Sequence, residues 1–125
     1  MSLLEESKVY KPFKYPWAVE YAVSHEKVHW GEWEAKLQED VAQWQGGKLS
    51  AQEKHHITQI LKLFTQSDVM VGRNYLEYYI PKFKNNEVRA MLTSFANREF
   101  VHQRSYALLN DTLGLPEGEF SAFLE

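Results

Sequence analysis

Two long helical patterns constrain the fold of this 125-residue chain more than any other feature. Between residues 50 and 80, apolar side chains recur at steps of three and four, as on an α-helix with one buried face. They are Ile57, Ile60, Leu61, Phe64, Val71 and Tyr75. A second stripe with the same period runs over residues 86–110 and consists of Val88, Met91, Leu92, Phe95 and Leu109. Because no segment alternates convincingly as a strand would, the sequence predicts an all-α fold.

Local signals predict where the helices begin and end. Ser50 and Glu53 have the spacing of a capping box at the start of the helix over 50–80, and Pro81 should end or kink that helix. Pro16 suits the first turn of a shorter helix over 16–29. We expect residues 1–15 to form an irregular arm, and residues 31–48 to form a connector with a short helical stretch near 34–44. The whole of 1–125 has the size of a single domain.

The predicted helices are too few to close a core. The two long ones would each measure roughly 35 to 45 Å at about 1.5 Å per residue, which is long for a chain of this size. Three helices cannot complete a four-helix bundle, so the apolar stripes need further helices to cover them. We therefore expect a partner chain, or a second copy of this one, to complete the bundle.

Composition excludes several classes of function. The net charge is −3 and no basic block occurs, so nucleic-acid binding has no electrostatic support. The absence of cysteine excludes a disulfide framework, thiolate ligands and a cysteine nucleophile, and it agrees with a reducing cytoplasm. No apolar run is long enough to cross a membrane, and the first residues lack the apolar segment of a signal peptide. We expect a cytoplasmic protein.

Polar side chains interrupt both apolar stripes. The first stripe continues onto Asp68, and the second continues onto Glu99, His102 and Tyr106, which fall within an arc of about 60° on one helix face. Burying an unpaired carboxylate is costly unless a cation or hydrogen bonds compensate it. A Glu-x-x-His pair offers one cation an oxygen and a nitrogen on adjacent turns, as in di-iron carboxylate bundles, where other helices each supply one carboxylate. The pattern predicts half of such a site.

Less specific interpretations stay open at this point. Glu-x-x-His often occurs by chance on a solvated face, Asp68 could be a buried acid satisfied by hydrogen bonds, and Tyr106 alone could be a core tyrosine. His25 and His29 lie one turn apart and could form a second metal pair, which is a weaker prediction.

The interrupted stripes resemble a known family. The string Glu99-Phe-Val-His102-Gln-Arg-Ser-Tyr106 resembles the metal-and-tyrosine helix of the class I ribonucleotide reductase small subunit. Thr65–Asp68 followed by Gly72–Arg73 resembles the segment with that family's first carboxylate ligand. Lys14–Trp17 and His29–Trp30 look like its first helix and the exit from it. The resemblance extends from about Lys14 to the end of the chain.

The resemblance implies a ferritin-like helical bundle with a di-metal site. Asp68, Glu99 and His102 would ligate the first metal, and Glu99 would bridge to the second. The implied cofactor is two iron ions, with manganese or a mixed manganese–iron pair as alternatives. The family's remaining ligands, two Glu and a second Glu-x-x-His, lie in helices that this chain lacks. The implied partners are a C-terminal half of the small subunit, a second small subunit and the large catalytic subunit, so the chain is not expected to be active alone.

The resemblance also assigns roles to aromatic residues. Tyr106 would become the stable tyrosyl radical that initiates reduction of ribonucleotides to deoxyribonucleotides. Trp30 would be the electron relay, and Phe64 would line the dry pocket around Tyr106. The family usually has a proline shortly after this tryptophan, which is absent here, so Trp33 is a competing relay. Two further interpretations are another ferritin-like di-metal oxidase or iron-storage relative, and a non-enzymatic helical oligomerisation module.

Overall fold

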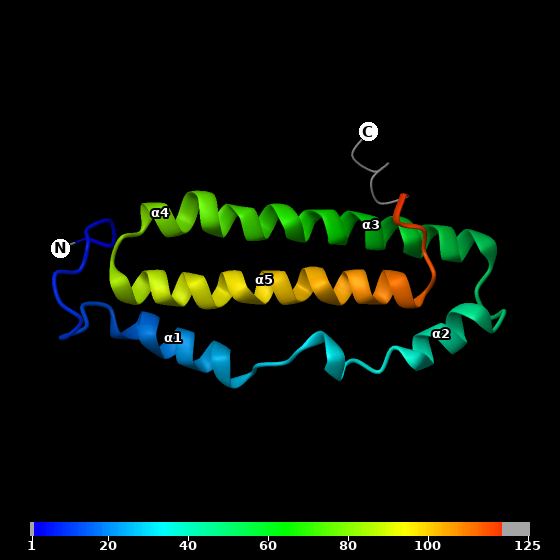
Figure 1. Cartoon of the computed structure of the whole chain (residues 1–125), viewed down its shortest axis with the longest axis horizontal. Coiled ribbons are helices and arrows are strands. Elements are labelled where there is room, and N and C mark those ends of the chain that lie inside the picture. The colour runs from blue at the N-terminus through cyan, green and yellow to red at the C-terminus, as the bar shows by residue number, and fades with distance from the viewer. Residues whose placement is uncertain (1, 119–125) are drawn as a thin grey trace. The chain divides into compact units, whose positions relative to one another are not determined.

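The described part of the chain is helical. The computed structural model describes residues 2–118, and no strand occurs among them. In chain order the elements are α1 (Pro16–Lys27), η1 (Glu32–Glu34), α2 (Gln38–Gln45), α3 (Ala51–Asn74), η2 (Tyr75–Tyr79), α4 (Ile80–Lys82) and α5 (Asn86–Thr112) (Figure 1). The all-α prediction is therefore confirmed. Within the described residues, no helix combines the length and apolar character needed to cross a bilayer.

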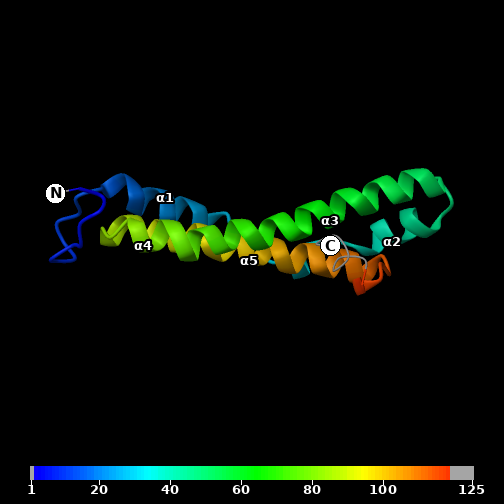
Figure 2. The ribbon, with the colours of Figure 1, turned by 90° about the horizontal axis from the view of Figure 1, so that it is seen from above.

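The chain divides into two compact units, and both long helices contribute to each of them. The first unit consists of Met1–Trp30 and Met70–Phe100, and the second of Gly31–Val69 and Val101–Glu125. Within the first unit, α1 runs beside α5, and within the second, α3 and α5 supply the two longest helical stretches (Figures 1 and 2). The predicted helix over 16–29 thus corresponds to α1, that over 50–80 to α3 and its continuation, and that over 86–110 to α5.

The start of α3 forms the predicted capping box. The Glu53 backbone N–H donates to Ser50 Oγ at 3.1 Å, and the Ser50 backbone N–H donates to Glu53 Oε2 at 2.7 Å. Each bond satisfies a backbone donor near the helix start that has no partner within the helix. The two contacts with Ser50, the backbone one being the stronger cause, lower the pKa of Glu53. The sequence signal for this helix start is confirmed.

We expect Ser50→Ala to destabilise the intact protein by about 1 kcal/mol, because the first turn of α3 loses its side-chain acceptor. Chemical denaturation followed by circular dichroism measures this change, and Gln52→Ala in the same turn serves as the control. The pKa of Glu53 is lower in the folded state, so its contribution is present above the unfolded-state pKa and is lost as the pH falls through the folded value. Equal unfolding midpoints for Ser50→Ala and the control would contradict the capping role.

The long helix ends through a widened turn rather than at Pro81 itself. Helix α3 passes into the π-helical turn η2, closed by a bond from the Ile80 N–H to the Tyr75 carbonyl, and helical structure continues to Lys82. Pro81 has no N–H to donate to the Glu77 carbonyl, and the widened turn lies immediately before it. Pro81 therefore predicted correctly where the long helix departs from regular α-helical geometry, but the π-helical turn has no sequence signature of its own.

The N-terminal arm is fixed to the start of α5. Ser7 Oγ accepts hydrogen bonds from the Asn86 backbone N–H at 2.9 Å and from Asn85 Nδ2 at 3.3 Å. Glu87 Oε2 accepts from the Tyr15 backbone N–H at 3.3 Å. Asn85 also caps α5 through Oδ1, which accepts from the Val88 N–H at 3.2 Å. The arm is irregular, as expected, but its docking depends on contacts that local patterns do not predict.

Helix α5 ends in a Schellman motif. The Gly114 N–H donates to the Asp111 carbonyl and the Leu115 N–H to the Asn110 carbonyl, both at 3.0 Å. Gly114 adopts φ 75°, the left-handed conformation that this motif requires and that glycine adopts without strain. Asn110 is buried within the last turns of α5 and donates from Nδ2 to Thr65 Oγ1 at 3.2 Å.

The apolar stripe of α3 is largely uncovered. Ile60, Phe64 and Val71 are 39%, 48% and 39% exposed, although the sequence marks them as core positions. The buried apolar residues of the described part are instead few and mostly small: Ala18, Val88, Ala96 and Val101. This exposure agrees with the expectation that the stripes need further helices to cover them.

Candidate metal centre

The two long helices bring three ligand-type side chains together. Asp68 comes from α3, and Glu99 and His102 come from α5. Each offers one ligand atom, and these atoms all lie within 4.8 Å of one another. All three side chains are half-buried. Across residues 2–118 no other group of three or more such side chains meets this condition. The structure therefore clusters the three residues that the sequence selected as metal ligands.

Helix geometry and one cross-helix bond position these residues. Glu99 and His102 are three residues apart, so α5 places them on adjacent turns of the same face. Gln103 follows His102, and its Nε2 donates to the Asp68 backbone carbonyl at 3.1 Å. This bond joins α5 to α3 at Asp68, one of the three clustered residues. Sequence reasoning missed Gln103, because a polar residue beside a ligand carries no pattern that distinguishes it from a solvated one.

The donor set suits a transition metal. Carboxylate oxygens with an imidazole nitrogen bind iron, manganese or zinc, whereas softer metals prefer thiolates, which this chain lacks. Three protein donors do not complete an octahedral coordination sphere, so further ligands would be needed. Asp68 and Glu99 bring two negative charges to a half-buried position, and a cation would compensate their repulsion. The residues present therefore fit part of the coordination sphere of a metal ion.

Tyr106 lies beside Phe64 and within the electrostatic range of Asp68. The rings of Phe64 and Tyr106 are stacked, with centroids 6.2 Å apart and planes at 6°. Burial, followed by the negative charge of Asp68, raises the pKa of the Tyr106 phenol above its usual 10.0. The phenol is therefore protonated at neutral pH, and one-electron oxidation would have to release its proton as well.

The two tryptophans that compete as relay have different surroundings. Trp30 is held by Arg98, whose Nη2 donates to the Trp30 carbonyl and whose Cζ lies 5.1 Å from the indole centroid. Trp33 is 70% exposed. Its ring packs on Gly31 so closely that a Cβ added there would lie 2.3 Å from it. Trp30 is itself 39% exposed, so its contacts with Arg98, rather than burial alone, set it apart from Trp33.

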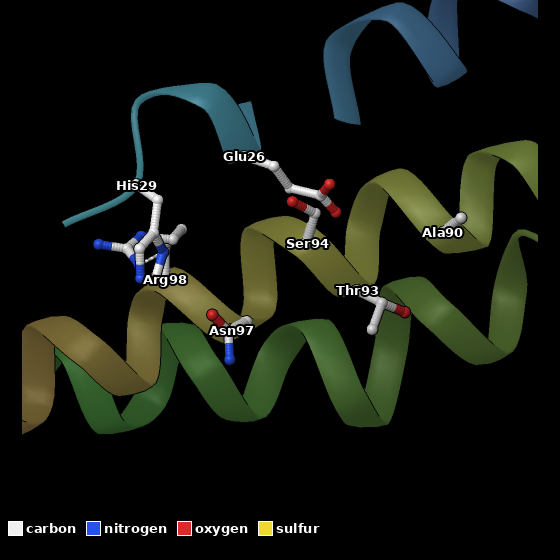
Figure 3. A pocket seen from close by; sticks show the side chains of 7 residues that line it. All are labelled: Glu26, His29, Ala90, Thr93, Ser94, Asn97 and Arg98. Carbon is white, nitrogen blue, oxygen red and sulfur yellow. Dashed lines mark hydrogen bonds between the residues drawn. The ribbon is translucent and has the colours of Figure 1, made fainter. Parts of the chain in front are cut away.

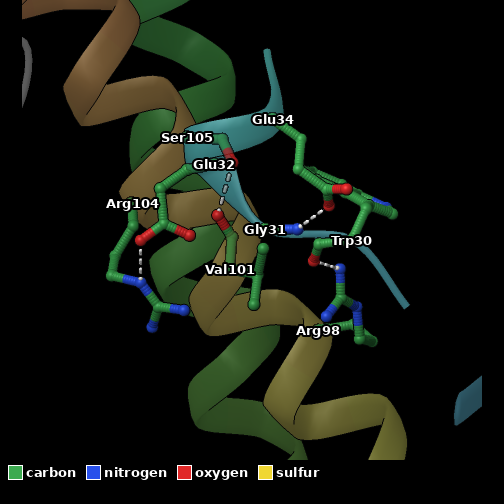
Figure 4. A network of polar contacts seen from close by, with 8 residues as sticks. All are labelled: Trp30, Gly31, Glu32, Glu34, Arg98, Val101, Arg104 and Ser105. Carbon is green, nitrogen blue, oxygen red and sulfur yellow. Dashed lines mark hydrogen bonds and ion pairs between the residues drawn. The ribbon is translucent and has the colours of Figure 1, made fainter.

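Three further interactions of polar or phenolic groups near these residues were not predicted from the sequence. Arg104 Nε donates to Glu32 Oε1 at 2.7 Å and so ties the turn η1 to α5 (Figure 4). Tyr75 has its pKa raised, first by burial and then by the charges of Glu99 and Tyr79. The Thr65–Asn110 pair links the two long helices one turn beyond Tyr106. Each group depends on how the helices pack, which residue spacing alone does not fix.

His25 and His29, which helical spacing would allow to form a metal pair, do not converge on one site. His25 Nδ1 lies 3.4 Å from Ser94 Oγ, and its ring packs edge-on against Phe95 at a centroid distance of 4.8 Å. His29 Nδ1 instead lies 3.1 Å from Arg98 Nη1 (Figure 3). A guanidinium beside His29 opposes a second cation there.

One long helix carries a carboxylate, and its neighbour carries Glu-x-x-His with a tyrosine one turn further on. This arrangement defines a ferritin-like helical protein with a candidate metal centre. The chain belongs to the ribonucleotide reductase small-chain family, because the family model "Ribonucleotide reductase, small chain" matches residues 7–125. This confirms the family expected from the sequence.

Relatives in viruses and bacteria support the same family. A probable ribonucleoside-diphosphate reductase small subunit of Invertebrate iridescent virus 6 is 41% identical over 99% of this chain. A second, from Invertebrate iridescent virus 3, is 40% identical over the whole chain. The ribonucleoside-diphosphate reductase subunit beta of Chlamydia pneumoniae is 31% identical over 91% of it. The chain spans about a third of the length of these relatives, 33–34%.

Proposed function

We propose that this chain is the N-terminal part of a ribonucleotide reductase small subunit, and that it supplies half of a di-metal site together with the radical tyrosine. The observation that carries the proposal is the cluster of Asp68, Glu99 and His102 within 4.8 Å, in a chain of this family whose Tyr106 lies one turn beyond the histidine. The proposed activity is the initiation of ribonucleotide reduction to deoxyribonucleotides by a large subunit.

The residues of this chain take distinct roles in the proposal. Asp68, Glu99 and His102 hold a metal, and the bond from Gln103 keeps α3 and α5 in register around it. When bound, a pair of iron or manganese ions supplies oxygen-dependent one-electron oxidation. Tyr106 gives up an electron and its phenolic proton, and Phe64 shields one face of its ring. Exclusion of water preserves the resulting radical.

The proposed partners follow from the uncovered surfaces and the length of the relatives. The remaining ligands, two Glu and a second Glu-x-x-His, would come from a C-terminal half of the small subunit. That half would also cover the exposed stripe of α3, including Ile60, Phe64 and Val71. A second small subunit and the large catalytic subunit complete the proposed assembly, which we place in the cytoplasm.

The test is reconstitution of the small subunit that contains this chain with ferrous iron, manganese or both, followed by oxygen. We expect two metal ions per subunit, a tyrosyl signal by electron paramagnetic resonance, and reduction of a ribonucleoside diphosphate once a large subunit is added. Residues 1–125 alone should give neither the full metal content nor the radical. Adding the complementary polypeptide should restore both.

Two outcomes would replace the proposal. Metal binding and oxygen consumption without ribonucleotide reduction would indicate another ferritin-like oxidase or an iron-storage protein, which leaves Tyr106 without a special role. Absence of bound metal in the assembled protein would indicate a helical oligomerisation module.

A further inference from the structure

Arg98 is a buried cation next to the proposed ligand Glu99 on α5. It is 7% exposed, although arginine is almost never this buried unless it is paired. Among the described residues it forms no ion pair with a carboxylate. Its positive charge therefore lies in a partly desolvated position beside its nearest neighbours, in a pocket that Glu26 also lines.

Those neighbours, His29 and Trp30, lie in the segment that follows α1. Arg98 Nη2 donates to the Trp30 carbonyl, and Nη1 lies 3.1 Å from His29 Nδ1 (Figures 3 and 4). Because a guanidinium cannot accept a hydrogen bond, Nη1 is the donor and His29 Nδ1 the acceptor in this contact. Two hydrogen bonds thus anchor the His29 side chain and the Trp30 backbone to α5.

The same guanidinium also lies over the Trp30 indole. Its Cζ is 5.1 Å from the ring centroid, within the range of a cation–π contact. The contact is attractive while the indole is neutral, because the ring face is electron-rich. If the indole loses an electron, the ring becomes positive and the guanidinium repels it. The contact therefore stabilises the reduced ring and destabilises the oxidised one.

We propose that Arg98 is a positioning residue that raises the potential at which Trp30 is oxidised and so keeps the Trp30 radical short-lived. The proposal rests on the proposed relay role of Trp30. A metal pair held in part by Asp68, Glu99 and His102 would supply, with oxygen, the one-electron oxidant, and Trp30 would give up one electron and no proton. The indole radical cation is then reduced by one electron from a reductant in solution, such as ascorbate.

The experiment follows the indole radical by its transient absorption after metal-loaded, complete small subunit is mixed with oxygen. Arg98→Gln removes the charge and should lengthen the radical lifetime by roughly threefold to tenfold, as expected for loss of a partly buried cation–π contact. Arg98→Lys retains a charge and should stay closer to the wild-type lifetime. If Arg98→Gln fails to fold, Arg98→Met replaces it, because it fills the volume of the aliphatic stem without a charge.

Two controls separate this inference from the proposed function. Arg104→Gln loosens the turn that follows Trp30 without removing a charge from the indole, and should leave the lifetime unchanged. Trp30→Phe should abolish the transient; if the transient persists, the relay assignment fails, and the inference about Arg98 that rests on it fails too, whereas failure of the Arg98 inference alone leaves this result intact. The inference about charge would be overturned if the indole radical had the same lifetime in the wild type and in Arg98→Gln. It would also be overturned if Arg98→Lys and Arg98→Gln lengthened that lifetime equally.

Discussion

Tyr106→Phe should abolish the tyrosyl radical while leaving the metal content of the assembled small subunit unchanged. Phenylalanine lacks the hydroxyl that releases a proton on oxidation, and its ring is much harder to oxidise. The ring retains its volume and can still stack on Phe64, so the stability cost should stay below about 1.5 kcal/mol. Electron paramagnetic resonance should show no tyrosyl signal, and ribonucleotide reduction should fall at least about a thousandfold.

Tyr75→Phe is the matched control for this prediction. Tyr75 is also half-buried with a raised pKa, and it lies within range of Glu99 rather than Asp68. Because Tyr75 has no proposed radical role, its variant should keep the signal of the wild type. An identical signal in Tyr106→Phe would refute the radical assignment, and loss of the signal only in Tyr75→Phe would move that role to Tyr75.

Asp68→Asn should remove most of the bound metal. The substitution preserves the shape of the side chain but replaces an anionic ligand by a neutral amide, which binds hard and borderline cations much more weakly. We expect the metal content, measured by mass spectrometry at equal free metal, to fall to roughly a tenth or less, in line with a loss of more than about 1.4 kcal/mol in binding. The tyrosyl signal should fall with it.

The same substitution should have the opposite effect on the metal-free protein. Asp68 and Glu99 place two negative charges in a half-buried cluster, and this repulsion costs folding free energy when no cation is bound. Asp68→Asn should therefore raise the thermal midpoint of the metal-free form and lower that of the loaded form. Glu77→Gln is the control, since Glu77 lies on the same helical stretch and pairs with the exposed Arg73 at 3.9 Å. Equal metal content in Asp68→Asn and Glu77→Gln would contradict the ligand assignment.

Features that depend on residues close in the chain could be predicted from the sequence. The capping box of α3 formed because Ser50 and Glu53 are three residues apart, and the helix itself brings them into contact. Glu99 and His102 share a face for the same reason. The interruption of an apolar stripe by Asp68 was also visible, because the period of the stripe sets which positions lie on one face.

The tertiary structure decided the contacts between residues that lie far apart in the chain. Gln103 reaches the Asp68 carbonyl, 35 positions away, and Arg98 reaches Trp30, 68 positions away. The choice of Trp30 over Trp33 as the anchored tryptophan follows from the second of these contacts. The sequence determined the helices and the ligand types on them, because helical periodicity is local. Which side chains meet across helices was decided only by packing, since it depends on the rotation and offset of each helix against its neighbour.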